Sequence, residues 1–342
     1  MRSKTVGLIN LNRERPYLDA AHLDQLIDVW LAECADRLDD LGPDGRFGGT
    51  TAGYAAKIRY FRDWWALAGP GHDWRLSQAS LREFERWLRH RPAEFGGPLA
   101  YHSRRDSLRR LRAMLRWAQV EGYIVGLAPA DWVPAPAGDP PARTLVSDSA
   151  LVRLLRAAEL TAHPARNTAI LAVLIGTGVR RRECAMLRVE DLRMDADLSG
   201  NIVVRAAKRT RRGQVVRTVL FDSTAGAYLD RWLDLAGVME GPLFPSQKTG
   251  DHLSARSLGR IVRQCWDIAG LTAEQPCHDL RRKFVTEWRR LHRGAGPDVD
   301  HLLQMQVGHA DGDMTTHYSL QGVEDVRQAF VSPMRALPRP GE

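Results

Sequence analysis

The sequence lacks the usual marks of secreted, membrane and zinc proteins. Its four cysteines are scattered, with no C-x-x-C pair and no histidine at metal-ligand spacing, which argues against structural zinc and against a disulfide framework. Charged residues interrupt the N-terminal stretch before any apolar run is long enough for a signal peptide, and no window approaches a transmembrane span. These absences predict a protein of the reducing cytoplasm with no membrane partner.

Lysine is also scarce. Only five of the 49 basic residues are lysines, so arginine carries nearly all of the positive charge. The formal net charge of +8 indicates a polyanionic partner, and such a balance fits nucleic acid, membrane surfaces and ribosomes. A chain of 342 residues is long enough for two or three domains and a sizeable core.

Composition predicts four regions along the chain. Apolar residues recur at helical spacing from Leu23 to Leu38, which indicates one amphipathic helix. A single helix is too short to fold alone, so it must pack on a neighbouring domain or on a partner chain. The predicted regions are an N-terminal extension with this helix (1–45), a helical domain (46–132), a proline-rich linker (133–142) and a larger domain with a C-terminal tail (143–342).

The segment 46–132 is predicted to be a bundle of helices. One apolar stripe covers 54–65, and Ser80 with Glu83 forms a capping box ahead of the next helix. A third stripe covers 108–118.

The outer side of that third helix is dense in arginine, with Asp106 as the one local counter-charge. Because a solvated helix face usually mixes charges of both signs, this row favours contact with phosphates. The candidate DNA-binding residues on this helix are Arg104, Arg105, Arg109, Arg110, Arg112 and Arg116.

The second half of the chain mixes two periodicities. Helical patterns cover 148–159, 166–176, 223–238 and 254–269, with a last weak helix at about 322–336. Residues 201–220 instead hold two β-branched runs on either side of a basic turn, which predicts a strand, a turn and a second strand. The turn carries Lys208, Arg209, Arg211 and Arg212. The chain is therefore predicted to be mainly α with a small antiparallel β-sheet.

Side chains that can touch an anionic oxygen gather in two clusters. The first is Thr177-Gly178-Val179-Arg180-x-x-Glu183, which follows an apolar run and turns into a helix; the second lies between Cys277 and Tyr318. Arginine offers a rigid fork of donors, histidine a donor or proton carrier, and tyrosine a hydroxyl that can attack. Each motif alone also fits the solvated surface of a helix or, for the tyrosine, an ordinary buried phenol. Together the motifs indicate a phosphate substrate. In chain order the candidates are Arg180, Glu183, Lys208, His278, Arg281, Gly308-His309 and Tyr318.

In that order the motifs resemble the tyrosine recombinase (phage integrase) family, over about 143–330 and more loosely over 46–132. The resemblance implies a helical core-binding domain and a mixed α/β catalytic domain. It also implies a site-specific recombinase that cleaves and rejoins DNA through a covalent 3′-phosphotyrosyl intermediate. The implied partners are double-stranded recombination sites, further copies of the chain in a tetramer on DNA, and optional accessory DNA-bending proteins; the implied location is the nucleoid. Two residues depart from the family's common pattern, Arg282 where histidine is frequent and Lys283 where a small hydroxyl residue is frequent.

A role for each candidate follows from its chemistry and from the resemblance. A phenol titrates near pH 10 and an alkoxide leaves poorly, so the attack needs charge neutralisation and a proton for the leaving oxygen. The expected roles are Tyr318 as nucleophile, Arg180 and Arg281 as donors to the non-bridging oxygens, Lys208 as general acid, His278 and His309 as proton carriers, and Glu183 as a support for Arg180. Guanidinium groups replace the cations of a two-metal nuclease, so neither a metal nor a cofactor is expected.

Two other functions fit the same motifs. One is strand relaxation like that of type IB topoisomerases, which shares the chemistry. The other is a DNA-binding regulator that kept the fold and lost catalysis. All of the expected polar groups are present, which argues against the regulator, and the tail after Tyr318 favours an assembling recombinase. In that tail Val323, Val326, Ala329 and Phe330 form a short apolar stripe, which is expected to bury itself either on its own domain or on a neighbouring protomer.

Overall fold

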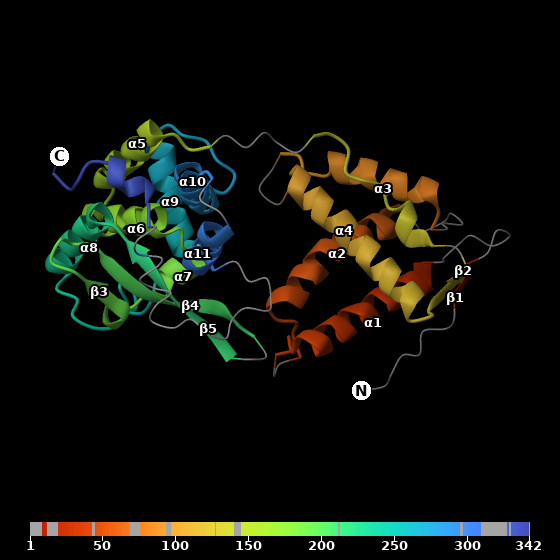
Figure 1. The fold of residues 1–342 in the computed structure, drawn as a ribbon. Helices are drawn as coiled ribbons and strands as arrows, with labels where there is room; N and C mark the ends of the chain where they lie inside the picture. Colours follow the sequence, from red (N-terminus) through yellow and green to blue (C-terminus); the bar gives the residue numbers. More distant parts are fainter. Residues whose placement is uncertain are drawn as a thin grey trace. The chain divides into compact units, whose positions relative to one another are not determined.

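In the computed structural model the chain divides into two compact units, Met1–Arg143 and Thr144–Glu342 (Figure 1). The structure describes residues 9–11, 20–42, 45–68, 76–93, 97–126, 128–139, 145–210, 213–294, 297–308, 327 and 330–341. Within these ranges no helix has the length and apolarity that crossing a bilayer requires.

The described part of the first unit contains four α-helices, and periodicity predicted each of them. They are α1 (Ala20–Leu38), α2 (Gly49–Ala68), α3 (Gln78–His90) and α4 (Tyr101–Val120). Leu26, Phe61, Phe84 and Leu111 meet in one core, so α1 packs with the other three helices rather than apart from them. A short parallel pair, β1 (Ile9–Leu11) with β2 (Ile124–Gly126), was not predicted. The 3-10 helix η1 (Pro129–Trp132) follows β2.

The predicted start of α3 is wrong by three residues. The N-cap is Ser77, whose hydroxyl accepts from the backbone N–H of Ser80 at 3.1 Å. The Ser80 hydroxyl in turn accepts from the backbone N–H of Ser77 at 2.8 Å, so Ser80 closes the capping box at the third helical position instead of opening it. Glu83 has no part in the cap.

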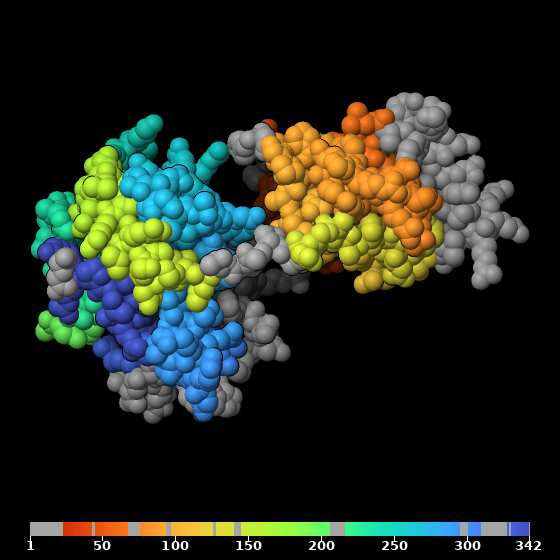
Figure 2. All heavy atoms as spheres, turned by 90° about the horizontal axis from the view of Figure 1, so that it is seen from above, coloured from red at the N-terminus to blue at the C-terminus, as the bar shows by residue number. Residues whose placement is uncertain are grey.

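The predicted linker 133–142 begins as part of the first unit. Val133 is buried in the helical core, and Ala137 donates its backbone N–H to Glu85 of α3 at 2.9 Å. In Figure 2 the yellow region, which includes residues 128–139, lies along the orange helices of the same unit.

The second unit is organised around α6 (Pro164–Thr177), which is buried from Arg166 to its end. Its sequence is apolar on every side, as expected of a helix with neighbours all round. The larger helices around it are α5 (Asp148–Glu159), α8 (Ser223–Ala236), α9 (Ala255–Ile268) and α10 (Pro276–Leu291). The shorter elements are α7 (Arg181–Ala185), η2 (Val189–Asp191) and α11 (Pro297–Val307).

A three-stranded antiparallel sheet completes this unit, in the order β3 (Leu192–Met194), β4 (Gly200–Thr210), β5 (Gly213–Phe221). Ile202 pairs with Val219, and an irregularity in the register falls between Arg205 and Arg209. The prediction of a mainly α chain with a small antiparallel β-sheet is confirmed. The three-residue β3 was not predicted.

The described end of the chain folds back on its own unit. The Phe330 ring lies 6.3 Å from that of Phe284 and 6.1 Å from that of Trp288, measured between centroids. Met334, in the 3-10 helix η3 (Pro333–Ala336), is buried in the main core. Of the predicted helix at 322–336, Arg327 is helical and Pro333–Ala336 form a 3-10 turn. Val323, Val326 and Ala329 lie outside the described residues.

Candidate active site

The site is built on the turn that ends α6. Gly178 closes the helix with a left-handed backbone (φ +66°), and a Cβ added there would lie 2.7 Å from a ring carbon of Phe284. Glycine therefore meets two demands at once, a positive φ and a close approach. The Thr177 hydroxyl donates to the Val173 carbonyl at 2.6 Å and accepts from the Val179 N–H at 3.3 Å, which fixes the chain as it leaves the helix.

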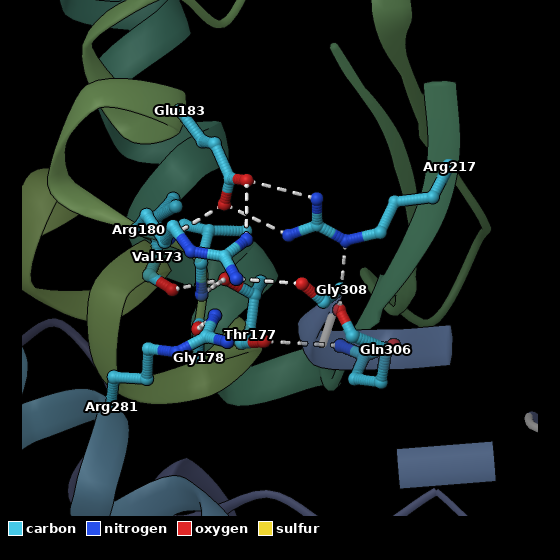
Figure 3. Close-up of polar contacts among 10 residues, drawn as sticks. Val173, Thr177, Gly178, Arg180, Glu183, Arg217, Arg281, Gln306 and Gly308 are labelled. Atoms are coloured by element: carbon cyan, nitrogen blue, oxygen red, sulfur yellow. Dashed lines mark hydrogen bonds and ion pairs between the residues drawn. The ribbon is translucent and has the colours of Figure 1, made fainter. Parts of the chain in front are cut away.

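Arg180 leaves this turn as the N-cap residue of α7 (Figure 3). Its backbone N–H donates to Glu183 Oε2 at 2.7 Å, and its Nη1 donates to Glu183 Oε1 at 3.0 Å. Its Nη2 donates to the Gly308 carbonyl at 2.6 Å. The side chain is 46% exposed, so a ligand can reach the guanidinium.

Glu183 is a buried carboxylate held by two arginines. Besides Arg180 it accepts from Arg217 of β5, Nη1 to Oε1 at 3.0 Å and Nη2 to Oε2 at 2.8 Å. Burial raises the pKa of Glu183, but the hydrogen bonds and charge of Arg217, followed by those of Arg180, outweigh it, so this pKa lies below its usual range. Glu183 is thus suited to hold arginines in place rather than to release a proton.

Arg281 of α10 approaches the same turn from the other side. Its Nη1 donates to the Gly178 carbonyl at 2.6 Å, and the side chain is 5% exposed. Burial, then the nearby charge of Arg180, lowers the pKa of Arg281 to about 10, so the guanidinium stays charged at neutral pH. Its Nη2 is buried and has no hydrogen-bond partner among the described residues. A buried cationic donor without a partner, beside a second arginine, fits an oxyanion ligand such as phosphate.

The structure thus brings Arg180, Glu183, Arg281 and Gly308 of the predicted set together (Figure 3). His278 is exposed in the first turn of α10.

Other predicted members fall wholly or partly outside the description. The backbone of Lys208 and Arg209 belongs to β4, but their side chains are outside the described part. Arg211, Arg212, His309 and Tyr318 lie outside the described residues.

Two residues of this site were missed from the sequence, Arg217 and Gln306. Gln306 is fully buried in α11, and its Nε2 donates to the carbonyls of Thr177 and Leu220 at 3.2 and 2.9 Å. Its Oε1 accepts from the Leu220 N–H at 3.0 Å, so one side chain ties β5 to the end of α6. The acid-free stretch 205–217 marked the hairpin as basic, but nothing in it singled out Arg217.

The two departures from the family pattern are engaged with acidic residues outside the arginine cluster. Arg282 donates to Asp279 at 3.0 Å. Lys283 is buried, with its Nζ 2.7 Å from both Asp148 and Glu287. Burial lowers the pKa of Lys283, but hydrogen bonds to these two carboxylates outweigh it and raise this pKa overall. Neither residue occupies the space between Arg180 and Arg281.

The predicted arginine row on α4 is narrower than expected, because half of it is used inside the first unit. Arg104 is mostly buried and donates to Glu85 at 3.3 Å and to the Ala137 carbonyl at 3.1 Å. Arg112 donates to the Val133 carbonyl at 2.5 Å. Arg110 lies over the Tyr54 ring, 3.9 Å from its centroid. These three side chains are partly buried, because their partners come from segments distant in sequence, and their contact with DNA stays a prediction.

The other three arginines of the row do face solvent. Arg105, Arg109 and Arg116 have half or more of their side chains exposed. Asp106 lies 3.8 Å from Arg105 and 3.6 Å from Arg109, and Asp131 lies 3.8 Å from Arg116. Pairs this long and exposed are weak, so these guanidinium groups are free to exchange a carboxylate for a phosphate.

Comparison with known proteins identifies one family. The family model described as "Phage integrase family" matches residues 145–322. Tyrosine recombinase XerC of Lactobacillus delbrueckii subsp. bulgaricus is 32% identical over 176 residues, which cover 48% of this chain and 55% of that protein. Tyrosine recombinase XerC 2 of Ralstonia nicotianae is 27% identical over 282 residues, which cover 79% of this chain and 76% of that protein. The chain thus spans little more than half the length of the Lactobacillus relative it matches.

Solved structures share the fold at low identity. A lambda integrase (75–356) dimer bound to a COC′ core site aligns with a TM-score of 0.57 at 17% identity, covering 87% of this chain and 98% of that one. XerH site-specific recombinase bound to difH substrate, in a pre-cleavage complex, aligns with a TM-score of 0.57 at 18% identity, covering 89% and 83%. A lambda integrase tetramer bound to a Holliday junction aligns with a TM-score of 0.57 at 17% identity, covering 87% and 80%.

Proposed function

Because this chain belongs to the phage integrase family, we propose that it is a site-specific tyrosine recombinase, which cuts and rejoins DNA strands through a phosphotyrosyl intermediate. The observation that carries the proposal is the buried Nη2 of Arg281, which has no partner in the described part of the chain and lies near the half-exposed guanidinium of Arg180. These donors, on rigid elements, suit the non-bridging oxygens of a phosphodiester.

The two arginines would act on the charge that builds during attack. A five-coordinate phosphorus carries more negative charge on its equatorial oxygens than the starting diester does. Arg281 is preorganised by Gly178 and Arg180 by Glu183, so little reorganisation is needed at the moment of reaction. For this role Arg180 must exchange its Gly308 contact for a phosphate oxygen.

The remaining steps use residues outside the described side chains, together with His278. Tyr318 attacks phosphorus through its phenolic oxygen, and the bond from phosphorus to the 5′-oxygen breaks. Lys208 protonates that leaving oxygen, while His278 and His309 orient the phosphate and take up the proton of Tyr318. The phosphotyrosyl ester can then be attacked by a 5′-hydroxyl, which restores the diester without a nucleotide.

Duplex DNA is the proposed partner, and both units would contribute phosphate contacts. Arg105, Arg109 and Arg116 would contact phosphates from the first unit, and Arg209, Arg211 and Arg212 from the β4–β5 hairpin. The three solved structures named above are complexes with core-site, difH and Holliday-junction DNA, and one of them is a tetramer. We extend both properties, binding to a recombination site and a tetrameric assembly on DNA, to this chain as part of the proposal.

A suicide substrate tests the proposed function directly. When a duplex carries a nick next to the cleavage position, the released fragment diffuses away and the covalent intermediate accumulates. Incubation of the full chain with such a duplex should give a protein–DNA adduct on a denaturing gel. Relaxation of supercoiled plasmids of unrelated sequence would favour the topoisomerase alternative. Sequence-specific binding without any adduct would favour the inactive regulator.

The exposed arginines of α4 lead to a prediction about salt. Each phosphate contact releases counterions, so replacing Arg105, Arg109 and Arg116 together by alanine should flatten the plot of log binding constant against log salt by about one unit per lost contact. A matched control replaces Arg59, Arg82 and Arg86, which are exposed on α2 and α3 and remove the same charge. Equal slopes for the two triple variants would indicate that the exposed arginines of α4 face solvent and do not contact phosphates.

A further inference from the structure

The bidentate pair between Arg217 and Glu183 has no part in the mechanism above. Arg217 projects from β5 with a side chain only 11% exposed, and its two terminal nitrogens donate to the two oxygens of Glu183 (Figure 3). Two parallel hydrogen bonds between a planar fork and a carboxylate fix the plane of the carboxylate as well as its position. Glu183 is almost completely buried, so no water can substitute for this partner.

The same two oxygens of Glu183 hold Arg180. Oε1 accepts from Nη1 of Arg180, and Oε2 accepts from its backbone N–H. The guanidinium of Arg180 is therefore aimed by a carboxylate whose own orientation is set by Arg217. A side chain that touches no substrate can in this way determine where a phosphate donor points.

Arg217 also reaches the last turn of α11. Its Nε donates to the Gln306 carbonyl at 3.2 Å, while Arg180 Nη2 donates to the Gly308 carbonyl. A Cβ added to Gly308 would lie 2.8 Å from the Arg217 guanidinium, so only glycine lets the strand arginine pass this close. The two arginines thus satisfy carbonyls at the C-terminal end of α11, the point from which the chain continues to His309.

We propose that Arg217 is a positioning residue for strand cleavage, because it locks Glu183 in the orientation that aims Arg180 and ties the end of α11 to the same carboxylate. The inference rests on the proposed function, since what it positions is the proposed phosphate donor. A buried ion pair of this kind is poor evidence of stabilisation, because desolvation offsets most of the attraction between the charges. The role that remains for the Arg217–Glu183 pair is to orient Glu183.

Removal of Arg217 should leave a signature in the pH profile of cleavage. Among the described residues, the ionisable groups that face Glu183 are Arg180 beside it, Arg217 from β5, Arg281 from α10 and the Cys184 thiol of its own helix. Described side chains of α6, α9 and β4 form no ion pair or hydrogen bond with it. Burial raises the pKa of Glu183 and Arg217 provides the largest opposing effect, so this pKa must rise when Arg217 is lost. A protonated Glu183 cannot hold Arg180 as an ion.

The central test is Arg217→Met, measured by single-turnover adduct formation. We expect cleavage to fall about 10- to 100-fold, as small misplacements of a catalytic group do, with binding of the uncleaved duplex unchanged. Below neutral pH the variant should lose more activity than the wild type does, in a range between the lowered pKa of Glu183 in the wild type and its raised value in the variant. In the Glu183→Gln, Arg217→Met double variant this extra acid loss should disappear, because the titrating group is gone. His278 and His309 are present in all of these proteins, so their effect on the pH profile is the same in each and does not alter the difference between them.

Two further variants serve as controls for misfolding. The double variant leaves no unpaired buried carboxylate, so it stays testable if Arg217→Met unfolds. Arg205→Met breaks a second bidentate pair on the same hairpin, in which Arg205 donates to Asp191 at 2.8 Å through Nη2 and also through Nη1. It is expected to cleave at the wild-type rate. An Arg217→Met variant that behaves like Arg205→Met, or that shows no new acid loss, would overturn the inference.

A binding measurement separates failure of this inference from failure of the proposed function. Inorganic phosphate, added at constant ionic strength, should raise the Tm of the wild type and of Arg205→Met, and raise it less for Arg217→Met. This comparison needs no cleavage. If the wild type forms no adduct, the proposed function fails and the phosphate comparison still decides the role of Arg217. Equal Tm increases in all three proteins, or no increase in the wild type, would contradict it.

Discussion

Tyr318→Phe should form no covalent adduct with a suicide duplex while it binds the same duplex as tightly as the wild type. The change removes one oxygen, the atom proposed to attack phosphorus, and leaves the ring and the charge of the protein unaltered. No residual rate is expected, since the intermediate is an ester of that oxygen. A denaturing gel for the adduct and a native gel for binding, run on the same samples, give both results.

Tyr228→Phe is the matched control. It removes a phenolic oxygen from the same unit, where Tyr228 donates to the Pro338 carbonyl at 3.0 Å. Loss of that hydrogen bond should cost about 1 kcal/mol of folding stability and leave adduct formation intact. An adduct that survives in Tyr318→Phe, or that vanishes equally in both variants, would show that another group attacks.

The motifs could be predicted from the sequence because each is short and local. Gly178 ends a helix, Arg180 and Glu183 sit three positions apart across the start of the next, and Arg281 lies in the first turns of α10. Spacings of three or four residues place side chains on one helical face whatever the rest of the fold does. The same rule predicted the four helices of the first unit and α5, α6, α8 and α9 of the second, because their apolar stripes are long. It did not predict α10 and α11.

Errors arose where the deciding partner is distant in sequence. Arg104 appeared solvent-facing because its carboxylate, Glu85, lies on another helix and its carbonyl acceptor, Ala137, beyond the end of α4. Ser80 and Glu83 matched a capping box, but Ser77, three residues earlier, takes the N-cap position. Local patterns of this kind fix which residues can form a cap, and packing fixes which of them do.

Arg217 shows most clearly which contacts the sequence alone could not predict. Its partners, Glu183 and Gln306, lie 34 and 89 positions away along the chain. In the sequence it is one more arginine at the end of a basic hairpin. Only the sheet, by setting β4 against α7 and β5 against α11, turns Arg217 into the residue that orients a carboxylate.

Arg180→Ala and Arg281→Ala should each bind a recombination site and lose most cleavage. Removal of one donor to a developing oxyanion costs about 3 kcal/mol, or about a hundredfold or more in rate. Binding should change little, because one phosphate contact among many adds little to affinity for the whole duplex. Single-turnover adduct formation and native-gel binding, at one salt concentration, measure the two effects separately.

The two variants should differ in stability. Arg180 is half exposed, and its loss leaves Glu183 with the bidentate pair to Arg217. Arg281 is buried, so its loss opens a cavity and removes a donor from the Gly178 carbonyl. Arg281→Ala should therefore unfold at a lower temperature than Arg180→Ala, and its rate must be measured below that transition.

Arg182→Ala controls for the loss of one positive charge, and the lysine variants separate charge from geometry. Arg182 is exposed on α7, two positions from Arg180, and its replacement removes the same charge without touching the cluster, so it should cleave at nearly the wild-type rate. Arg180→Lys and Arg281→Lys keep a cation but lose the fork that reaches two acceptors at once. If charge alone mattered, the lysine variants would cleave like the wild type; if geometry matters, they should fall close to alanine. Cleavage and binding that decline in parallel in either alanine variant would reduce that arginine to an ordinary phosphate contact.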